Sequence, residues 1–149
     1  MKTINKEIVT KSTQTVYVAN DGTEFENAEE CKKYEKSARG VLYAKYAPKL
    51  VKTSDEESLF GFGSPENYLD LVRVETQEDA DLILQILLLE NSWYTDEDHK
   101  ERREEAIAQI NSAIGDFLIV GRGYDHDSFW LYGSRKSFIE DFNKKFEEL

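Results

Sequence analysis

The sequence has little of what membrane-spanning and secreted proteins need. Its longest apolar-rich stretch, residues 82–89, is about half the length of the roughly 20 residues that cross a bilayer as a helix. The N-terminal residues MKTINKEIVTK lack the apolar core and the small-residue cleavage site of a signal peptide. The single cysteine, Cys31, excludes an intramolecular disulfide. We therefore expect a cytoplasmic protein without membrane contact.

Motifs for catalysis and metal binding are equally scarce. With one cysteine and 2 histidines, the chain has no paired CxxC motif and no HExxH motif for zinc. The glycine pairs at residues 61 and 63 and at residues 121 and 123 do not match a dinucleotide- or phosphate-binding loop. Cys31 falls on the apolar side of a predicted helix, which favours packing over nucleophilic chemistry. The sequence thus predicts no cofactor and no metal, and it favours a protein that is not an enzyme.

Apolar residues are nevertheless abundant enough to form a core. The 149 residues are 40% hydrophobic and 12% aromatic, which suits one ordinary domain and argues against disorder. We expect a single domain over residues 1–149, with residues 1–47 as a candidate semi-detached lobe of a β-hairpin and a helix.

Hydrophobic periodicity predicts an α+β fold. Strands are expected at residues 3–11, 15–19, 23–25, 68–75, 117–121 and 128–132. Helices are expected at residues 27–40 with a resumption at 41–46, at 76–90, at 95–114, and from Ser134 onward. Because the strands come mostly as hairpins, we expect antiparallel hairpins with three to four amphipathic helices packed on one face.

Two of these helices carry features that matter below. The helix at 76–90 begins with Thr76 and has Asp79 in the position of a capping box. The last helix carries an apolar stripe made of Phe138, Ile139, Phe142 and Phe146.

Negative charge is abundant and unevenly distributed. The net charge is −11, yet residues 1–52 hold ten basic and seven acidic residues, whereas residues 53–98 hold 13 acidic residues and one base, Arg73. This sign excludes unaided binding to a nucleic-acid backbone, which needs Lys and Arg. Acidity can serve solubility alone, but it can also form a surface for a basic protein partner. The residues of that hypothetical contact surface are Asp55, Glu56, Glu57, Glu75, Glu78, Asp79 and Asp81.

The tip of the second long hairpin is the alternative candidate site. Arg122, Asp125, His126 and Asp127 combine a base, two carboxylates and an imidazole, which can bind a ligand or a metal or act as acid and base. However, adjacent residues on a strand point to opposite faces, and Asp is common in turns for backbone reasons. A hairpin tip is therefore the simpler interpretation.

Residues 16–35, VYVANDGTEFENAEECKKYE, combine an aromatic strand, an Asp-Gly turn, an aromatic residue and a helix with Cys-x-x-Tyr-Glu. This element resembles one in small accessory proteins of bacteriophages and prophages. The resemblance covers about a seventh of the chain and includes no catalytic residue. It implies a phage-encoded protein acting in the bacterial cytoplasm, of the kind that includes inhibitors of host defence such as anti-CRISPR proteins.

These observations lead to three hypotheses. The first is a non-enzymatic inhibitor whose carboxylates engage a basic surface of a host nucleic-acid-binding complex, without contacting nucleic acid directly. The second is a small ligand- or metal-binding protein, or an enzyme, that uses the hairpin tip at residues 122–127. The third is a structural or assembly subunit of a phage. The oligomeric state stays open, with a homodimer among the alternatives.

Overall fold

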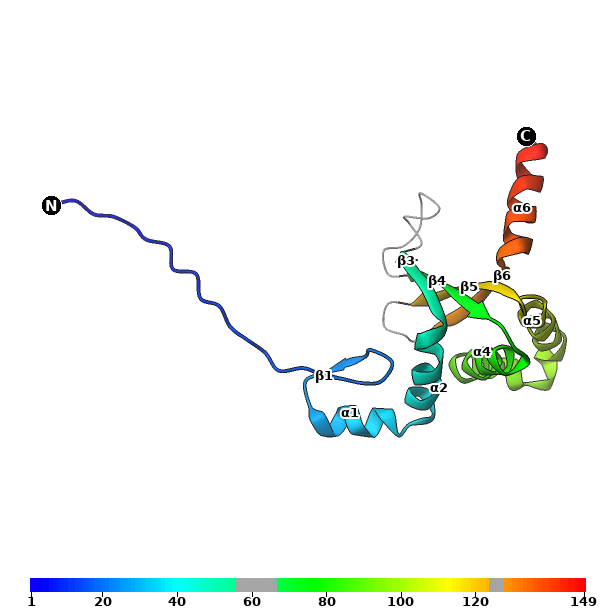
Figure 1. Cartoon of the computed structure of the whole chain (residues 1–149), viewed down its shortest axis with the longest axis horizontal. Coiled ribbons are helices and arrows are strands. Elements are labelled where there is room, and N and C mark those ends of the chain that lie inside the picture. The colour runs from blue at the N-terminus through cyan, green and yellow to red at the C-terminus, as the bar shows by residue number, and fades with distance from the viewer. Residues whose placement is uncertain (56–66, 124–127) are drawn as a thin grey trace.

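The computed structural model describes residues 1–55, 67–123 and 128–149. It shows the predicted α+β fold, in which helices flank an antiparallel sheet (Figure 1). None of the helices in these ranges has the length and apolar character that a bilayer crossing needs.

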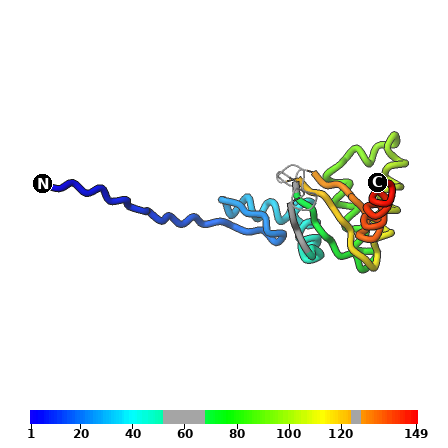
Figure 2. Tube along the Cα trace, turned by 90° about the horizontal axis from the view of Figure 1, so that it is seen from above, coloured from blue at the N-terminus to red at the C-terminus, as the bar shows by residue number. Residues whose placement is uncertain are grey.

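The N-terminal segment lies away from the rest of the molecule. Residues 1–16 contain no helix or strand and extend outward in both views (Figures 1 and 2). The prediction of a strand at residues 3–11 is therefore wrong: none of the strands in the described ranges pairs with this segment, and Ile4 and Ile8 are 71% and 87% exposed. The predicted hairpin that follows is confirmed but short: β1 (Tyr17–Val18) pairs with β2 (Glu24–Phe25) around Gly22, whose φ is 91°.

The first helical region is divided into two helices. Asn27 caps α1 (Ala28–Glu35), and Ser37 caps α2 (Ala38–Tyr46), so the break falls at Ser37 and not at Gly40 as the sequence suggested. Gly40 has a different role, because a Cβ at this position would lie 2.1 Å from the backbone oxygen of Tyr34. The missing side chain allows the first turn of α2 to pack closely against the end of α1.

A four-stranded antiparallel sheet forms the centre of the molecule. Its order is β3 (Leu50–Asp55), β4 (Asn67–Val74), β5 (Asp116–Gly123) and β6 (Phe129–Ser134). The sequence predicted β4, β5 and β6, but no strand was expected at residues 50–55, so β3 was missed. In the β4–β5 register Val72 lies opposite Leu118 and Asp70 opposite Val120, which places these residues on one face of the sheet.

Helices α4 (Gln77–Glu90) and α5 (Lys100–Ser112) cover that face, and α2 packs beside them. Two short 3₁₀ turns, η2 (Ser92–Thr95) and η3 (Glu97–His99), connect α4 to α5, so α5 begins five residues later than predicted. A third 3₁₀ turn, η1 (Ala47–Lys49), joins α2 to β3. The buried residues of the shared core include Tyr43, Tyr46, Val72, Val74, Ile83, Ile86, Leu87, Ile110, Leu118, Val120 and Phe129.

The last helix, α6 (Arg135–Glu147), begins at the predicted cap Ser134 but differs from α4 and α5 in its surroundings. After its first turns it projects beyond the sheet (Figure 1). Every residue from Ile139 to the end of the helix is exposed, including the apolar ones. The start of α6 thus contacts β5 and β6, but from Ile139 onward the helix does not cover the sheet.

Candidate functional site

The residues of the predicted acidic contact surface lie in three different settings. Asp55 is the last residue of β3, where it pairs with Tyr68 in the sheet register. Glu56 and Glu57 lie outside the described residues. Glu75, Glu78, Asp79 and Asp81 all lie at the start of α4 or just before it, and only these four have a described environment.

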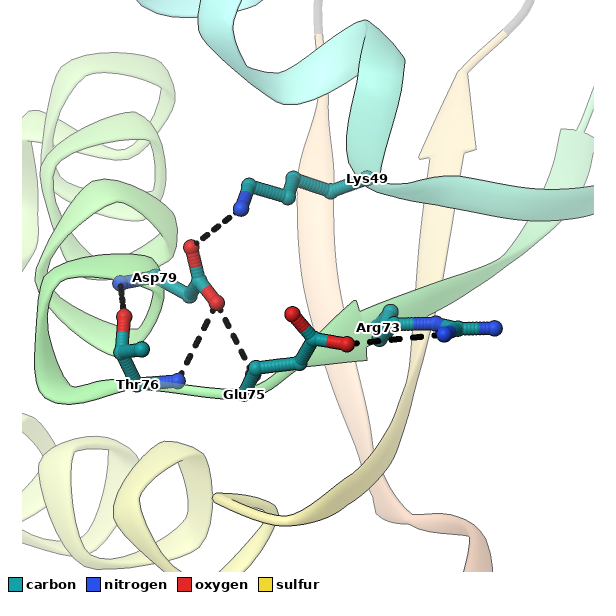
Figure 3. Close-up of polar contacts among 5 residues, drawn as sticks. All are labelled: Lys49, Arg73, Glu75, Thr76 and Asp79. Carbon is teal, nitrogen blue, oxygen red and sulfur yellow. Dashed lines mark hydrogen bonds and ion pairs between the residues drawn. The ribbon is translucent and has the colours of Figure 1, made fainter.

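Asp79 is the member of this set that the fold itself uses (Figure 3). Its carboxylate accepts hydrogen bonds from the backbone amides of Glu75 at 2.8 Å and Thr76 at 3.1 Å, while the Thr76 hydroxyl accepts from the Asp79 amide at 3.2 Å. This is the predicted capping box, here confirmed with Asp at the position that Glu or Gln usually occupies. The other carboxylate oxygen lies 2.7 Å from the Lys49 Nζ atom, at the end of η1.

The electrostatics agree with this structural role. Burial by itself raises the pKa of Asp79, but the Lys49 ammonium and the two backbone amides outweigh that effect and hold the pKa below its ordinary value of 3.8. The same contact raises the pKa of Lys49. Asp79 is 6% exposed. It is thus an ionised, buried cap, and its carboxylate is not available to a protein partner.

The neighbouring acids remain at the surface. Glu78 is exposed, and so is Asp81, which accepts a hydrogen bond from the Gln77 side chain at 2.9 Å. Glu75 is also exposed and lies 3.4 Å from the Arg73 guanidinium, in a pair whose side chains are both more than half exposed (Figure 3). Such solvated pairs contribute little to stability, so these three carboxylates can change partners at small cost.

Helix α5 adds acids that sequence reasoning did not include. Its N-terminal half exposes Glu101, Glu104 and Glu105. The two helices are in contact, and a 3.1 Å hydrogen bond from the Gln77 side chain to the Asn111 side chain joins the start of α4 to the end of α5, so the acids of α5 lie toward the other end of this antiparallel pair. The acids of the DEDHKERREE stretch are visible in the sequence, but the contact between this helix and α4 depends on the tertiary fold. We call the exposed acids of these two helices the acidic helical face, which consists of Glu78, Asp81, Glu101, Glu104 and Glu105.

This face lies within a larger acidic surface region. From Glu75 to Ser112 the structure exposes nine acidic side chains, against the exposed bases Lys100 and Arg102 and the half-buried Arg103. Arg103 donates to the backbone oxygen of Tyr94 at 2.7 Å, which ties its guanidinium to η2. Negative charge therefore dominates this part of the surface, as expected from the sequence.

Of the four residues of the alternative site at the hairpin tip, Arg122 lies within the described part of the chain. Asp125, His126 and Asp127 lie outside the described residues. Arg122 is 8% exposed, and its Nε atom donates to Asp70 Oδ2 at 2.9 Å while a second guanidinium nitrogen lies 3.3 Å from Oδ1. The Tyr46 hydroxyl donates to the same carboxylate at 2.9 Å. Arg122 is thus part of a buried charged cluster that joins α2, β4 and β5.

A cavity of about 140 Å³ lies beside this cluster, and Tyr34, Tyr43, Tyr46 and Arg122 line it. Burial and a hydrogen bond to Asp21 raise the pKa of Tyr34 to about 12. Burial raises the pKa of Tyr43 and of Tyr46 further. These phenols stay protonated at neutral pH, so they offer hydrogen bonds but no general base.

Metal ligands and a reactive thiol are not assembled in the described part of the chain. Residues 1–55, 67–123 and 128–149 contain no cluster of three or more His, Cys, Asp or Glu side chains suited to a metal ion. Cys31 is buried, and burial together with the charges of Glu35 and Asp21 raises the pKa of its thiol. A raised pKa lowers the thiolate fraction, which makes Cys31 a poor nucleophile.

Comparisons with models of known protein families, with curated proteins and with solved structures found no match. The resemblance of residues 16–35 to phage accessory proteins therefore stays a prediction. Structurally, this element is a two-stranded hairpin followed by α1, in which Phe25 and Tyr34 pack with ring centroids 5.2 Å apart.

Proposed function

We propose that this chain is a non-enzymatic protein that binds a basic protein surface through the acidic helical face. The observation that carries the proposal is that the fold buries some acidic residues beside basic partners and leaves others exposed. Asp70 and Asp79 are buried and neutralised by Arg122 and Lys49. The five acids of the acidic helical face are exposed on two adjacent helices.

The arrangement suits a partner that normally binds nucleic acid. Helices hold their side chains at fixed spacing, so each of α4 and α5 presents its carboxylates in a defined arrangement on its exposed side. A Lys- and Arg-lined channel complements such an arrangement, which speeds association and favours the correct partner. In line with the phage resemblance, we propose that the partner is a nucleic-acid-binding defence complex of a bacterial host, inhibited in the manner of an anti-CRISPR protein.

The test is affinity purification of the tagged protein from a bacterial lysate at low and high salt, followed by a nuclease assay on the recovered complex. We expect a nucleic-acid-binding complex at low salt, with its activity inhibited by added protein. Reversal of Glu78, Asp81 and Glu104 to Lys should abolish recovery and inhibition. Asp79 is left intact, because its reversal would remove the cap of α4 and confound binding with unfolding.

The matched control reverses three exposed acids far from this face, Glu7, Glu24 and Glu26, so that the net charge changes by the same amount. This control should retain binding, since the proposal depends on local charge. If both triple variants lose binding equally, the effect is one of overall charge. If neither variant loses it, the acidic helical face is not the contact surface.

A further inference from the structure

The outer part of the apolar stripe of α6, made of Ile139, Phe142 and Phe146, is exposed to solvent. Ile139, Phe142 and Phe146 follow one another at intervals of three and four residues, so they lie on one side of the helix. They are 50%, 54% and 62% exposed, and the rings of Phe142 and Phe146 contact each other with centroids 4.9 Å apart. Contiguous exposed apolar side chains of this kind mark an interaction surface.

The charges on α6 indicate what covers the stripe. Residues 135–149 carry four basic and four acidic residues, so this segment is neutral in a chain whose net charge is −11. Along the helix the charges alternate in pairs, with Arg135 and Lys136 followed by Glu140 and Asp141, then by Lys144 and Lys145, and then by Glu147 and Glu148. A pattern that starts basic and ends acidic complements itself when the helix is reversed.

We propose that α6 pairs in an antiparallel manner with the α6 helix of a second copy of this chain, centred on Phe142. In this arrangement Phe142 meets Phe142 of the second copy, and Ile139 meets Phe146. The 3-and-4 spacing of the stripe is the spacing of helix–helix seams. Because α6 projects beyond the sheet, its stripe can be reached by another helix (Figure 1).

Centring on Phe142 also places opposite charges level with each other. Lys136 lies within one residue of the level of Glu147 of the second copy, and Asp141 lies within two residues of the level of Lys145, and each pair occurs twice by symmetry. On a helical projection Lys136 and Glu147 both lie along the same edge of the stripe. In an antiparallel pair, this edge of one helix lies beside the same edge of the other helix. A parallel pair would instead place like charges level with each other.

The base of α6 has room for the end of the second helix. An open groove of about 690 Å³ lies there between α6 and the connection from α5 to β5, and Ile114, Gly115, Arg135 and Ile139 are among its lining residues. A helix of 13 residues is about 20 Å long, so the far end of an antiparallel α6 reaches the level of this groove. The apolar stripe and the groove thus form one continuous surface.

The first test is sedimentation equilibrium of the full chain between about 1 and 200 μM. We expect a monomer–dimer equilibrium that Phe142→Asp shifts to monomer, with at least a hundredfold weaker association. Because Phe142 is already exposed in the single chain, the variant should unfold at the same urea concentration as the wild type when both are compared as dilute monomers. The matched control Leu89→Asp, at an exposed apolar residue of α4, should leave association unchanged.

The second test exchanges charges to establish the antiparallel arrangement. Lys136→Glu and Glu147→Lys should each weaken self-association roughly tenfold, because each turns two attractive surface pairs into repulsive ones. A mixture of the two variants should recover wild-type affinity as a heterodimer, in which every Glu again faces a Lys. A parallel pair predicts a different outcome, because its wild type already places Lys136 against Lys136 and Glu147 against Glu147, so neither variant alone would weaken association and the mixture would associate more tightly than the wild type.

Three results would overturn the proposal. They are a monomer at every concentration, a dimer that Phe142→Asp does not weaken, and a mixture that associates no better than either charge variant alone. A monomeric chain whose stripe is protected only when another protein is added would assign the surface to a different partner. None of these results depends on the acidic helical face, so the proposed function is tested separately.

Discussion

Replacement of Asp79 by Ala tests whether this acid belongs to the fold. The variant removes the acceptor of the backbone amides of Glu75 and Thr76 and takes a carboxylate from beside Lys49. Each lost hydrogen bond costs about 1 kcal/mol net, and loss of the partly exposed Lys49 pair adds roughly 0.5 kcal/mol. We expect the free energy of unfolding to fall by about 2–3 kcal/mol, which lowers Tm by about 5–10 °C for a chain of this size.

The assay is urea unfolding at pH 7, followed by far-UV circular dichroism and tryptophan fluorescence. Asp81→Ala provides the matched control, because Asp81 is an exposed acid two residues further along the same helix and should cost less than about 0.5 kcal/mol. Lys49→Met separates the ion pair from the cap and should cost roughly 0.5 kcal/mol. The reasoning fails if Asp79→Ala and Asp81→Ala are equally mild.

The pH dependence of the Asp79 effect has a defined sign. The pKa of this carboxyl is held below its ordinary value of 3.8 in the folded state, so the folded protein binds its proton less readily than the unfolded chain does. Its contribution is therefore fully present above the unfolded pKa and is lost as the pH falls through the lowered folded pKa. The stability gap between wild type and Asp79→Ala should stay constant from pH 5 to 8 and narrow below about pH 4. A gap that stays constant down to pH 2 would show that the charge of Asp79 contributes nothing.

Three further predictions follow from buried contacts. Asp70→Asn should reduce the free energy of unfolding by about 3–5 kcal/mol, measured by urea titration, because it removes the carboxylate from beside the buried Arg122 guanidinium; a loss below 1 kcal/mol would contradict this. Gly40→Ala should destabilise by about 1–3 kcal/mol in the same assay despite its better helix propensity, since the new methyl group meets the Tyr34 backbone; a stabilised variant would refute the close approach. The Cys31 thiol should react with a disulfide reagent at least a hundredfold faster in urea than in the native protein, and equal rates would exclude its burial.

Local patterns in the sequence sufficed for much of the architecture. The β4, β5 and β6 strands and helices α4 and α6 appear where alternation, helical periodicity and capping residues predict them. The capping box of Thr76 and Asp79 was readable because its two members lie three residues apart. The prediction of a strand at residues 3–11 was wrong because alternation with polar residues is only one requirement. A strand also needs a neighbouring strand to pair with.

The candidate site depended on contacts between residues far apart in the chain. Arg122 was a candidate ligand-binding residue at the tip of a hairpin, but the packing of β4 against β5 places Asp70 beside it. Asp79 looked like part of an acidic surface until packing placed it over Lys49. Neither pairing has a signal in the spacing of the residues, because each joins separate elements.

By itself, the sequence determined that this protein is an acidic α+β chain with an amphipathic last helix, because composition, periodicity and capping are local properties. The tertiary structure decided which charges and apolar residues remain exposed. Asp70 and Asp79 are buried in the fold, whereas Glu78 and Asp81 are exposed to solvent. Phe142 and Phe146 are exposed on a projecting helix. Exposure depends on what packs against a residue, and that is settled only when all the elements are brought together.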